Sequence, residues 1–141
     1  LMGCGRSPVQ TVQDNITNIG VVTIDSRSAI EVARTSYENL SEADKNLVNN
    51  YDILKVAEET YITMIVDECK TLFENSNFES GRQMLYDNAD LMNEEQIEDC
   101  MSTYETLYCL SYAEEQLIPQ LKDPYSYVMT NARISVFNNT T

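Results

Sequence analysis

The sequence predicts a mainly α-helical protein, and three observations support this prediction. Apolar residues recur every three or four positions through most of the chain, which is the spacing of a helix with one buried face. Ser, Asn and Asp stand where these patterns begin, as helix caps do. The hydrophobic fraction of the 141 residues is 43%, enough to bury a core. Three narrow apolar stripes in the N-terminal half predict a three-helix bundle, followed by further amphipathic helices.

The first helix is expected from Pro8 to Ile19. Ser7 is a suitable N-cap, Pro8 suits the first helical position, and Gln10 stands where a capping box has its second partner. Gly20 is a typical C-terminal stop. The expected buried face consists of Val9, Val12, Ile16 and Ile19.

A β-prone link, residues 21–24, precedes a second helix that Asp25 or Ser26 can cap. A Ser41 capping box then predicts a short helix that ends at residues 49–50. The second helix therefore has its own apolar stripe, and the short helix adds two apolar residues. The stripe consists of Ile30, Ala33, Tyr37 and Leu40, and the short helix contains Leu47 and Val48.

A longer helix is expected to start at an Asp52 cap and to end near residues 75–77. Residues 78–121 predict a short helix and then a long one, which Asn93 and Gln96 begin as a capping box. Pro119 is expected to end or kink it. The expected stripes are Leu54, Ala57, Tyr61, Met64, Ile65 and Leu72; then Met84, Leu85, Ala89 and Met92; then Ile97, Cys100, Met101, Tyr104, Leu107, Tyr108 and Ser111.

The pattern changes after Pro124. Tyr and Val residues, followed by an alternation around Ile134, predict a β-strand that looks truncated at Thr141. The predicted organisation is thus a tether at 1–7, a small helical bundle at 8–76, an additional helical region at 77–122, and the start of a β-region at 123–141.

The charge of the chain argues against nucleic acid as a partner. Nine basic and 23 acidic residues give a net charge of −14. Residues 62–141 account for more of this negative charge than residues 1–61. Nucleic-acid-binding proteins cluster Lys and Arg on one face, and no such cluster occurs in this sequence. The apolar runs are too short for a transmembrane helix.

The composition also limits catalysis. Without histidine, the chain cannot form a Ser-His-Asp triad, a Cys-His pair or a zinc site with histidine ligands. Adjacent carboxylates such as Glu58-Glu59, Glu94-Glu95, Glu98-Asp99 and Glu114-Glu115 point in different directions on a helix, so they predict solvated faces. Asp87-Asn88-Ala89-Asp90 lacks the spacing of a calcium loop. We therefore expect no enzymatic activity, catalytic residue, metal or cofactor.

The cysteines are Cys4, Cys69, Cys100 and Cys109, and none belongs to a Cys-x-x-Cys pair. Cys100 and Cys109 are separated by about 13 Å of helical rise, too far for a disulfide within one helix. Cys69 could meet either of them, so both pairings stay open. Burial of all three as small apolar residues is the simplest expectation.

The first four residues, Leu1-Met2-Gly3-Cys4, resemble the lipobox of bacterial lipoproteins. The resemblance implies cleavage before Cys4 and a diacylglyceryl group on its sulfur, with a signal peptide upstream of Leu1. Two acyl chains anchor a protein stably, at about 0.8 kcal/mol per buried CH₂. The partner implied for Cys4 is the lipid bilayer, and the implied location is the outer face of the cell membrane.

Residues 12–61 resemble a small helical repeat that occurs in secreted and surface-attached proteins of Gram-positive bacteria. The resemblance implies a spacer or interaction module without catalytic residues. The matching residues are Val12, Ile16, Ile19-Gly20, Val22-Thr23, Ser26, Ala29-Ile30-Glu31, Ala33-Arg34, Tyr37, Leu40-Ser41, Lys45, Val48, Asn50-Tyr51, Leu54, Ala57-Glu58 and Tyr61. Within this segment, Arg34 is expected to pair with Glu31 or Glu38 on its own helix.

These features lead to one principal hypothesis and two alternatives. The principal hypothesis is a non-enzymatic, Firmicutes-type surface lipoprotein that acts as a helical spacer or interaction module, with a surface protein or a cell-wall polymer as a possible partner. The first alternative is an accessory module of a secreted enzyme, for example a carbohydrate-active one, with its catalytic domain beyond Thr141. The second is a cytosolic helical adaptor.

Overall fold

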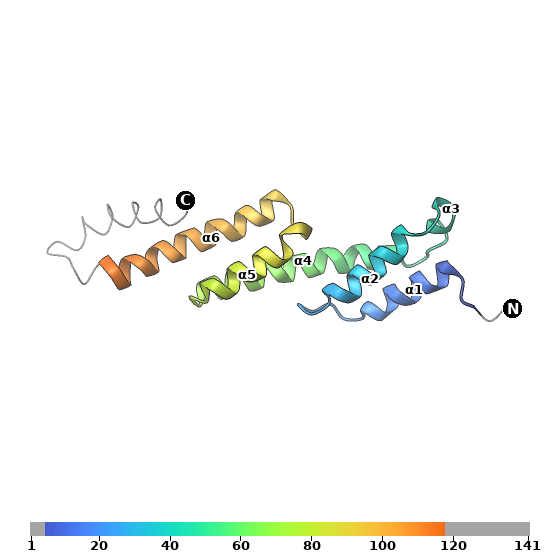
Figure 1. Cartoon of the computed structure of the whole chain (residues 1–141), viewed down its shortest axis with the longest axis horizontal. Coiled ribbons are helices and arrows are strands. Elements are labelled where there is room, and N and C mark those ends of the chain that lie inside the picture. The colour runs from blue at the N-terminus through green and yellow to red at the C-terminus, as the bar shows by residue number, and fades with distance from the viewer. Residues whose placement is uncertain (1–4, 118–141) are drawn as a thin grey trace. The chain divides into compact units, whose positions relative to one another are not determined.

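The computed structural model describes residues 5–117 and confirms that the protein is mainly α-helical (Figure 1). No strand occurs in this range. The elements in chain order are α1 (Pro8–Ile19), α2 (Arg27–Glu38), α3 (Glu42–Lys45), α4 (Tyr51–Glu74), α5 (Phe78–Asn88), the 3₁₀ turn η1 (Ala89–Leu91), α6 (Glu94–Tyr112) and the π-helical segment η2 (Ala113–Leu117). The β-region predicted at 123–141 and the predicted effect of Pro119 lie outside the described residues.

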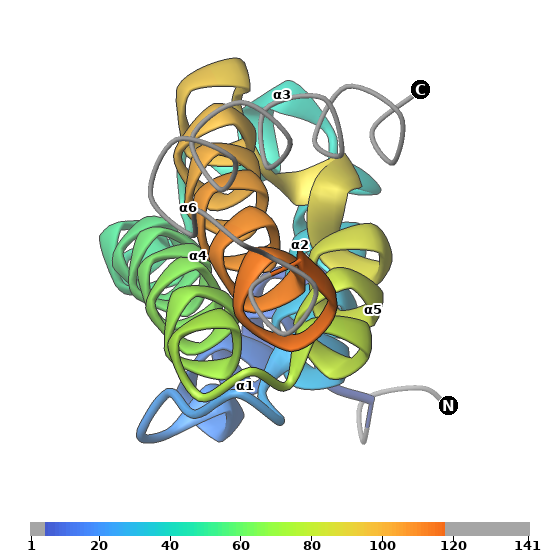
Figure 2. The same cartoon turned by 90° about the vertical axis from the view of Figure 1, so that its left-hand side faces the viewer.

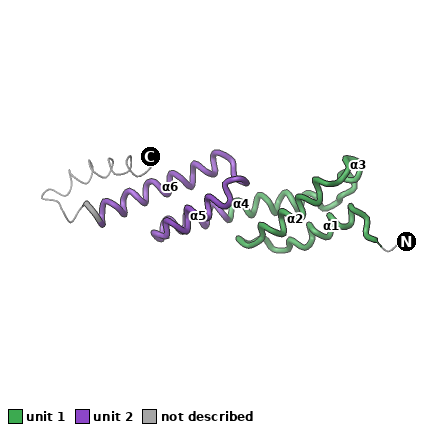
Figure 3. The backbone as a smooth tube through the Cα atoms, in the orientation of Figure 1, with its two compact units in different colours: residues 1–64 green, residues 65–141 purple. Residues whose placement is uncertain are grey.

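The chain forms two compact units, which divide between Met64 and Ile65, inside α4 (Figure 3). Unit 1 contains α1, α2, α3 and the N-terminal part of α4, and unit 2 contains the rest of α4 with α5, η1, α6 and η2. The sequence placed a boundary near residue 76, where α4 has already ended.

In unit 1, α1, α2 and the first half of α4 bury the faces that the apolar spacing predicts. α1 packs on α2, and the side chains at the centre of the core are at most a few per cent exposed. Burial of these apolar side chains stabilises the short helices, since isolated helices of this length are only marginally stable in water. The core consists of Val12, Ile16, Ile19, Ile30, Ala33, Leu40, Val48, Leu54, Ala57, Tyr61 and Ile62.

The capping of α1 follows the prediction in detail. The Gln10 backbone N–H donates to Ser7 Oγ at 3.1 Å, and the Ser7 N–H donates to Gln10 Oε1, which completes the capping box. Gly20 ends the helix with a φ of 62°. This backbone conformation is energetically unfavourable for a residue that has a Cβ atom. Asn93 and Gln96 form the capping box predicted at the start of α6, and at α3 the Ser41 hydroxyl accepts the predicted bond from the Asp44 N–H.

Several local predictions in unit 1 were wrong. Residues 21–24 form no strand, and the Ser26 N–H donates to the Thr23 carbonyl at 3.0 Å to close a turn over residues 23–26. In this turn the Thr23 N–H donates to Ser26 Oγ, so the Ser26 hydroxyl does not cap α2. α3 ends at Lys45, before Leu47, whose side chain is exposed, and Val48, which is buried. α4 begins at Tyr51, so Asp52 lies in its first turn and pairs with Lys55 instead of capping. In each case, hydrogen bonds or ion pairs between neighbouring residues set where the helix begins or ends. The spacing of apolar residues contains no information about these polar contacts.

The end of α4 lies where it was predicted, and its geometry is that of a Schellman motif. The N–H of Asn77 donates to the carbonyl of Leu72 at 2.8 Å, and the N–H of Ser76 donates to that of Phe73 at 3.0 Å. Ser76 has a φ of 63°, the left-handed conformation that this motif usually assigns to glycine. The turn directs the chain back along α4 as α5.

In unit 2, α5 runs back along the C-terminal half of α4, and α6 reverses direction again, so α6 runs parallel to α4 (Figures 1 and 2). In the described part of unit 2, the buried side chains are Ile65, Cys69, Phe73, Leu85, Asn88, Cys100 and Ala113. Gly81 is required where α5 meets α4, because a Cβ atom there would lie only 2.7 Å from Phe73 Cδ1. The α6 face predicted as apolar points inward, and apart from Cys100 its side chains are half-buried.

Candidate functional site

Cys4, the predicted lipidation site, lies outside the described residues. The described chain starts at Gly5, and the Ser7 cap of α1 follows two residues later. The predicted modification of Cys4 therefore stays a prediction.

The most elaborate polar cluster is centred on Arg34 in unit 1. Its guanidinium donates to both carboxylate oxygens of Glu58 on α4, with Nε–Oε1 at 2.7 Å and Nη2–Oε2 at 2.5 Å, and Nη1 donates to Glu38 at 3.0 Å. The rings of Tyr37 and Tyr51 stack with centroids 4.3 Å apart, and the guanidinium carbon lies 5.8 and 5.5 Å from them. The cluster thus links α2 to α4 through one planar cation.

Of the two partners that the sequence offered Arg34 on its own helix, the structure has Glu38. Glu31 pairs with Arg27 instead, at 2.7 Å. Glu58 was not predicted, because it lies 24 positions along the chain and only the packing of α2 on α4 brings it close. The stacked tyrosines were recognised as repeat residues, but nothing in their spacing identified them as a pair.

The electrostatics of the cluster stabilise its charges. The hydrogen bonds that Arg34 donates to Glu58 raise the pKa of Arg34 above its ordinary value, against the opposing effect of burial. The hydrogen bond from Arg34, followed by that from Lys45, lowers the pKa of Glu38. Groups held in their charged forms by one another are poor proton donors and acceptors near neutral pH, so the cluster has the character of a structural ion-pair network.

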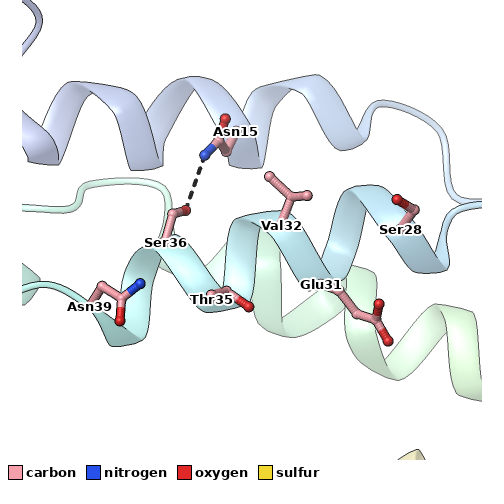
Figure 4. A pocket seen from close by; sticks show the side chains of 7 residues that line it. All are labelled: Asn15, Ser28, Glu31, Val32, Thr35, Ser36 and Asn39. Carbon is pink, nitrogen blue, oxygen red and sulfur yellow. Dashed lines mark hydrogen bonds between the residues drawn. The ribbon is translucent and has the colours of Figure 1, made fainter.

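A shallow surface groove of about 380 Å³ lies along α2, beside α1 (Figure 4). Across it, Asn15 Nδ2 of α1 donates to Ser36 Oγ of α2 at 3.1 Å, and Ser36 Oγ donates to the Ala33 carbonyl. Five of the seven lining residues carry a hydroxyl or amide group, one carries a carboxylate and one is an exposed aliphatic residue, while apolar atoms contribute the larger part of the exposed lining. The lining residues are Asn15, Ser28, Glu31, Val32, Thr35, Ser36 and Asn39. Such a surface can make hydrogen bonds with a polar partner, but it offers no paired nucleophile and base.

The structure places Cys69 of α4 in contact with Cys100 of α6 and not with Cys109, and no disulfide joins these three cysteines. Cys69 and Cys100 are free thiols with no exposed surface, and the hydrogen bond between them, together with burial, raises the pKa of Cys69. Burial alone raises the pKa of Cys109, which is half-buried further along α6.

Most carboxylates of the predicted acidic pairs are exposed. Two of them have a basic partner, and in each case only one member of the acidic pair is bound. Glu58 binds Arg34, while Asp99 accepts from Lys70 at 3.0 Å. In the segment proposed and set aside as a calcium loop, Asn88 is buried and its amide donates to the Met84 carbonyl. Within residues 5–117, no group of three or more Cys, Asp or Glu side chains has a geometry suitable for a metal ion.

No helix in the described part of the chain is both long and apolar enough to cross a bilayer. Comparisons with protein-family models, with curated proteins and with solved structures found no match to this chain. Inference about function therefore rests on the residues and geometry above.

Proposed function

We propose that this protein is a non-enzymatic lipoprotein of the outer face of a Gram-positive cell membrane, anchored through Cys4, whose helical units space or present an interaction surface. The lipobox-like Leu1-Met2-Gly3-Cys4 carries this proposal. The resemblance of residues 12–61 to a repeat of surface proteins supports it independently.

The position of the first helix relative to Cys4 suits such an anchor. Only residues 5–6 separate the cysteine from the Ser7 cap of α1. A fully extended chain spans at most about 3.6 Å per residue, so α1 would start within roughly 15 Å of the acylated sulfur. Unit 1 would then stand directly at the membrane surface, where its locally paired charges reduce repulsion from anionic headgroups.

The non-enzymatic part of the proposal rests on chemistry. The chain has no histidine, and the Arg34 guanidinium is bound to the carboxylates of Glu58 and Glu38 by hydrogen bonds. The groove beside α2 is the surface that we assign to interaction, because its hydroxyl and amide groups suit a polar polymer or a protein surface.

Lipidation is tested in a Gram-positive host that expresses the complete native reading frame and takes up an alkyne-bearing fatty acid. The wild-type protein is expected to acquire the label and to sediment with membranes. Cys4→Ala is expected to lose the label. Because cleavage before Cys4 is lost with the cysteine, the retained signal peptide keeps this variant with the membranes, so the label and not sedimentation decides the test. Cys109→Ala, which removes a half-buried thiol of α6, should keep the label like the wild type. A Cys4→Ala protein that stays labelled would refute the anchor.

The interaction surface is tested by co-sedimentation with purified Gram-positive cell-wall sacculi. Thr35→Arg places a bulky charge in the groove, and Thr60→Arg makes the same change at an exposed position of α4 outside it. Selective loss of sedimentation in Thr35→Arg would support the groove as a contact surface for wall polymer. Equal binding of both variants, or no binding by the wild type, would exclude this role for the groove.

A further inference from the structure

The two buried thiols of unit 2 lie at the same level of two parallel helices. Cys69 is on α4 and Cys100 is on α6, and neither side chain is exposed. Both are free and contact each other through a thiol hydrogen bond. No function considered above uses this pair.

The neighbouring contacts fix the register of the two helices around the thiols. One residue from each cysteine, Lys70 Nζ of α4 bonds to Asp99 Oδ2 of α6 at 3.0 Å. One helical turn further along both helices, the rings of Phe73 and Tyr104 meet with centroids 5.2 Å apart. Residues four apart lie on the same helix face, so these contacts place Cys69 and Cys100 on facing sides at one level.

We infer that Cys69 and Cys100 form an intramolecular disulfide that covalently joins α4 to α6 when the protein meets an oxidising thiol–disulfide environment. The pairing is selective. Cys109 lies nine positions beyond Cys100, about 13 Å along the same helix, which is outside disulfide range of the Cys69 level. The inference concerns a modification of unit 2 and does not depend on the anchor at Cys4.

The bond forms by two thiol–disulfide exchanges with a low-molecular-weight disulfide such as oxidised glutathione. The Cys100 thiolate attacks one glutathione sulfur, breaks the S–S bond and releases the first glutathione thiolate. The Cys69 thiolate then attacks the Cys100 sulfur and displaces the second. The two cysteines lose two electrons, glutathione disulfide gains them, and the two thiol protons end on the two released glutathiones.

Two features of the site bear on how the exchange proceeds. The hydrogen bond that Cys69 donates lowers the pKa of Cys100, which favours Cys100 as the attacking thiolate. Because both sulfurs are inaccessible in the folded unit, exchange requires α4 and α6 to separate locally, or it takes place during folding. Once formed, the bond would be protected from reductants by the same burial.

The experiment uses the full chain, purified reduced and then incubated with or without oxidised glutathione. Remaining thiols are alkylated in denaturant. Oxidation is expected to remove the mass of two hydrogen atoms and to block alkylation of Cys69 and Cys100 together. Digestion with trypsin and a glutamate-specific protease separates Cys100 from Cys109, because Glu105 lies between them. The linked peptides are expected to contain Cys69 and Cys100.

Variants distinguish this pairing from general thiol oxidation. Cys109→Ser should form the bond like the wild type, whereas Cys69→Ser and Cys100→Ser should not. Closing a loop of this length is expected to raise the Tm of the wild-type protein by roughly 10 °C relative to its reduced form. The inference is overturned if Cys69 and Cys100 are both alkylated after oxidation of the wild type, or if either is linked to another thiol. The wild-type mapping decides the matter even if a serine variant fails to fold.

Discussion

In unit 1 every basic side chain contacts a carboxylate, whereas unit 2 has a large acidic excess around a core of aromatic rings and thiols. The pairs of unit 1 join Arg6, Arg27, Arg34, Lys45 and Lys55 to acidic partners. From residue 65 onward the sequence has 4 basic and 14 acidic residues. There, Lys70 pairs with Asp99, and Arg82 lies 5.7 Å from the centroid of the Tyr104 ring.

Similar helical patterns are therefore stabilised by different forces in the two units. The Arg34 cluster connects the helices of unit 1 with directional bonds, and those bonds respond to ionic conditions. Unit 2 instead joins its helices through Phe73, Phe78, Tyr104 and Tyr108, whose ring centroids lie 5.2 to 6.0 Å apart. Salt does not screen aromatic contacts as it screens ion pairs, while the surrounding acidic charge works against compactness.

The largest effect is expected for Phe73→Ala, which removes the fully buried ring at the centre of unit 2. The cavity should lower the free energy of unfolding by about 3–5 kcal/mol. Chemical denaturation followed by circular dichroism measures this loss. Tyr86→Ala, at a side chain that is 80% exposed, is the control and should change stability by less than about 0.5 kcal/mol. Equal effects would mean that Phe73 is not a core residue.

Gly81→Ala should destabilise the same unit by about 1–3 kcal/mol, because the new methyl group overlaps the Phe73 ring. Alanine otherwise favours a helix over glycine by about 1 kcal/mol, so a stabilised variant would contradict the close approach of α5 to α4. Denaturation of Gly81→Ala in the Phe73→Leu background separates the two contributions, since the smaller side chain should relieve the overlap.

In unit 1, Arg34→Met should cost about 1–2 kcal/mol, because it leaves Glu58 and Glu38 without their shared cation. The side chain is 30% exposed, so solvent keeps the loss below that of a buried pair. Arg27→Met removes a pair within one helix turn and should cost only about 0.3–0.5 kcal/mol. If both variants lose the same stability, the link between α2 and α4 contributes nothing beyond a surface pair.

Salt should affect the two units in opposite directions, by less than about 1 kcal/mol each. Raising NaCl from about 0.01 M to about 1 M shortens the screening length from about 30 Å to about 3 Å. Screening should weaken the ion pairs of unit 1 and relieve repulsion in unit 2. Amide hydrogen exchange read by mass spectrometry should show faster exchange in α2 and slower exchange in α6. If the exchange rates of α2 and α6 change in the same direction, the proposed electrostatic difference between the two units is wrong.

The smallest expected effect is a pH dependence carried by Glu38. Because its pKa is lowered in the folded protein, its bonds to Arg34 and Lys45 contribute stability above the ordinary pKa of 4.5, and that contribution is lost as the pH falls further. The Tm difference between the wild type and Glu38→Gln should therefore shrink below that pH. In the Arg34→Met background, the Tm difference caused by Glu38→Gln should be smaller at every pH. If that Tm difference is unchanged, the stability contributed by Glu38 comes from its bond to Lys45 alone.

The sequence predicted most of the helices because the signals that define them are local. The capping boxes of α1 and α6 involve residues three positions apart, and Gly20 ends α1 by its own backbone freedom. Apolar spacing identified the buried faces for the same reason, since helix geometry fixes which residues share a face. The errors at Ser26 and Asp52 arose where neighbouring polar groups offered two bonding choices of similar energy.

The acidic charge follows from composition, and the helical class and several helix ends follow from residues within a turn or two of each other, so these features could be predicted. Which distant groups meet depends on how the helices pack: Arg34 with Glu58, Cys69 with Cys100, and Gly81 with Phe73. Many alternative packings would satisfy the same apolar stripes. Close packing of particular shapes selects one of them, and it thereby brings two cysteines together that the chain keeps 31 positions apart.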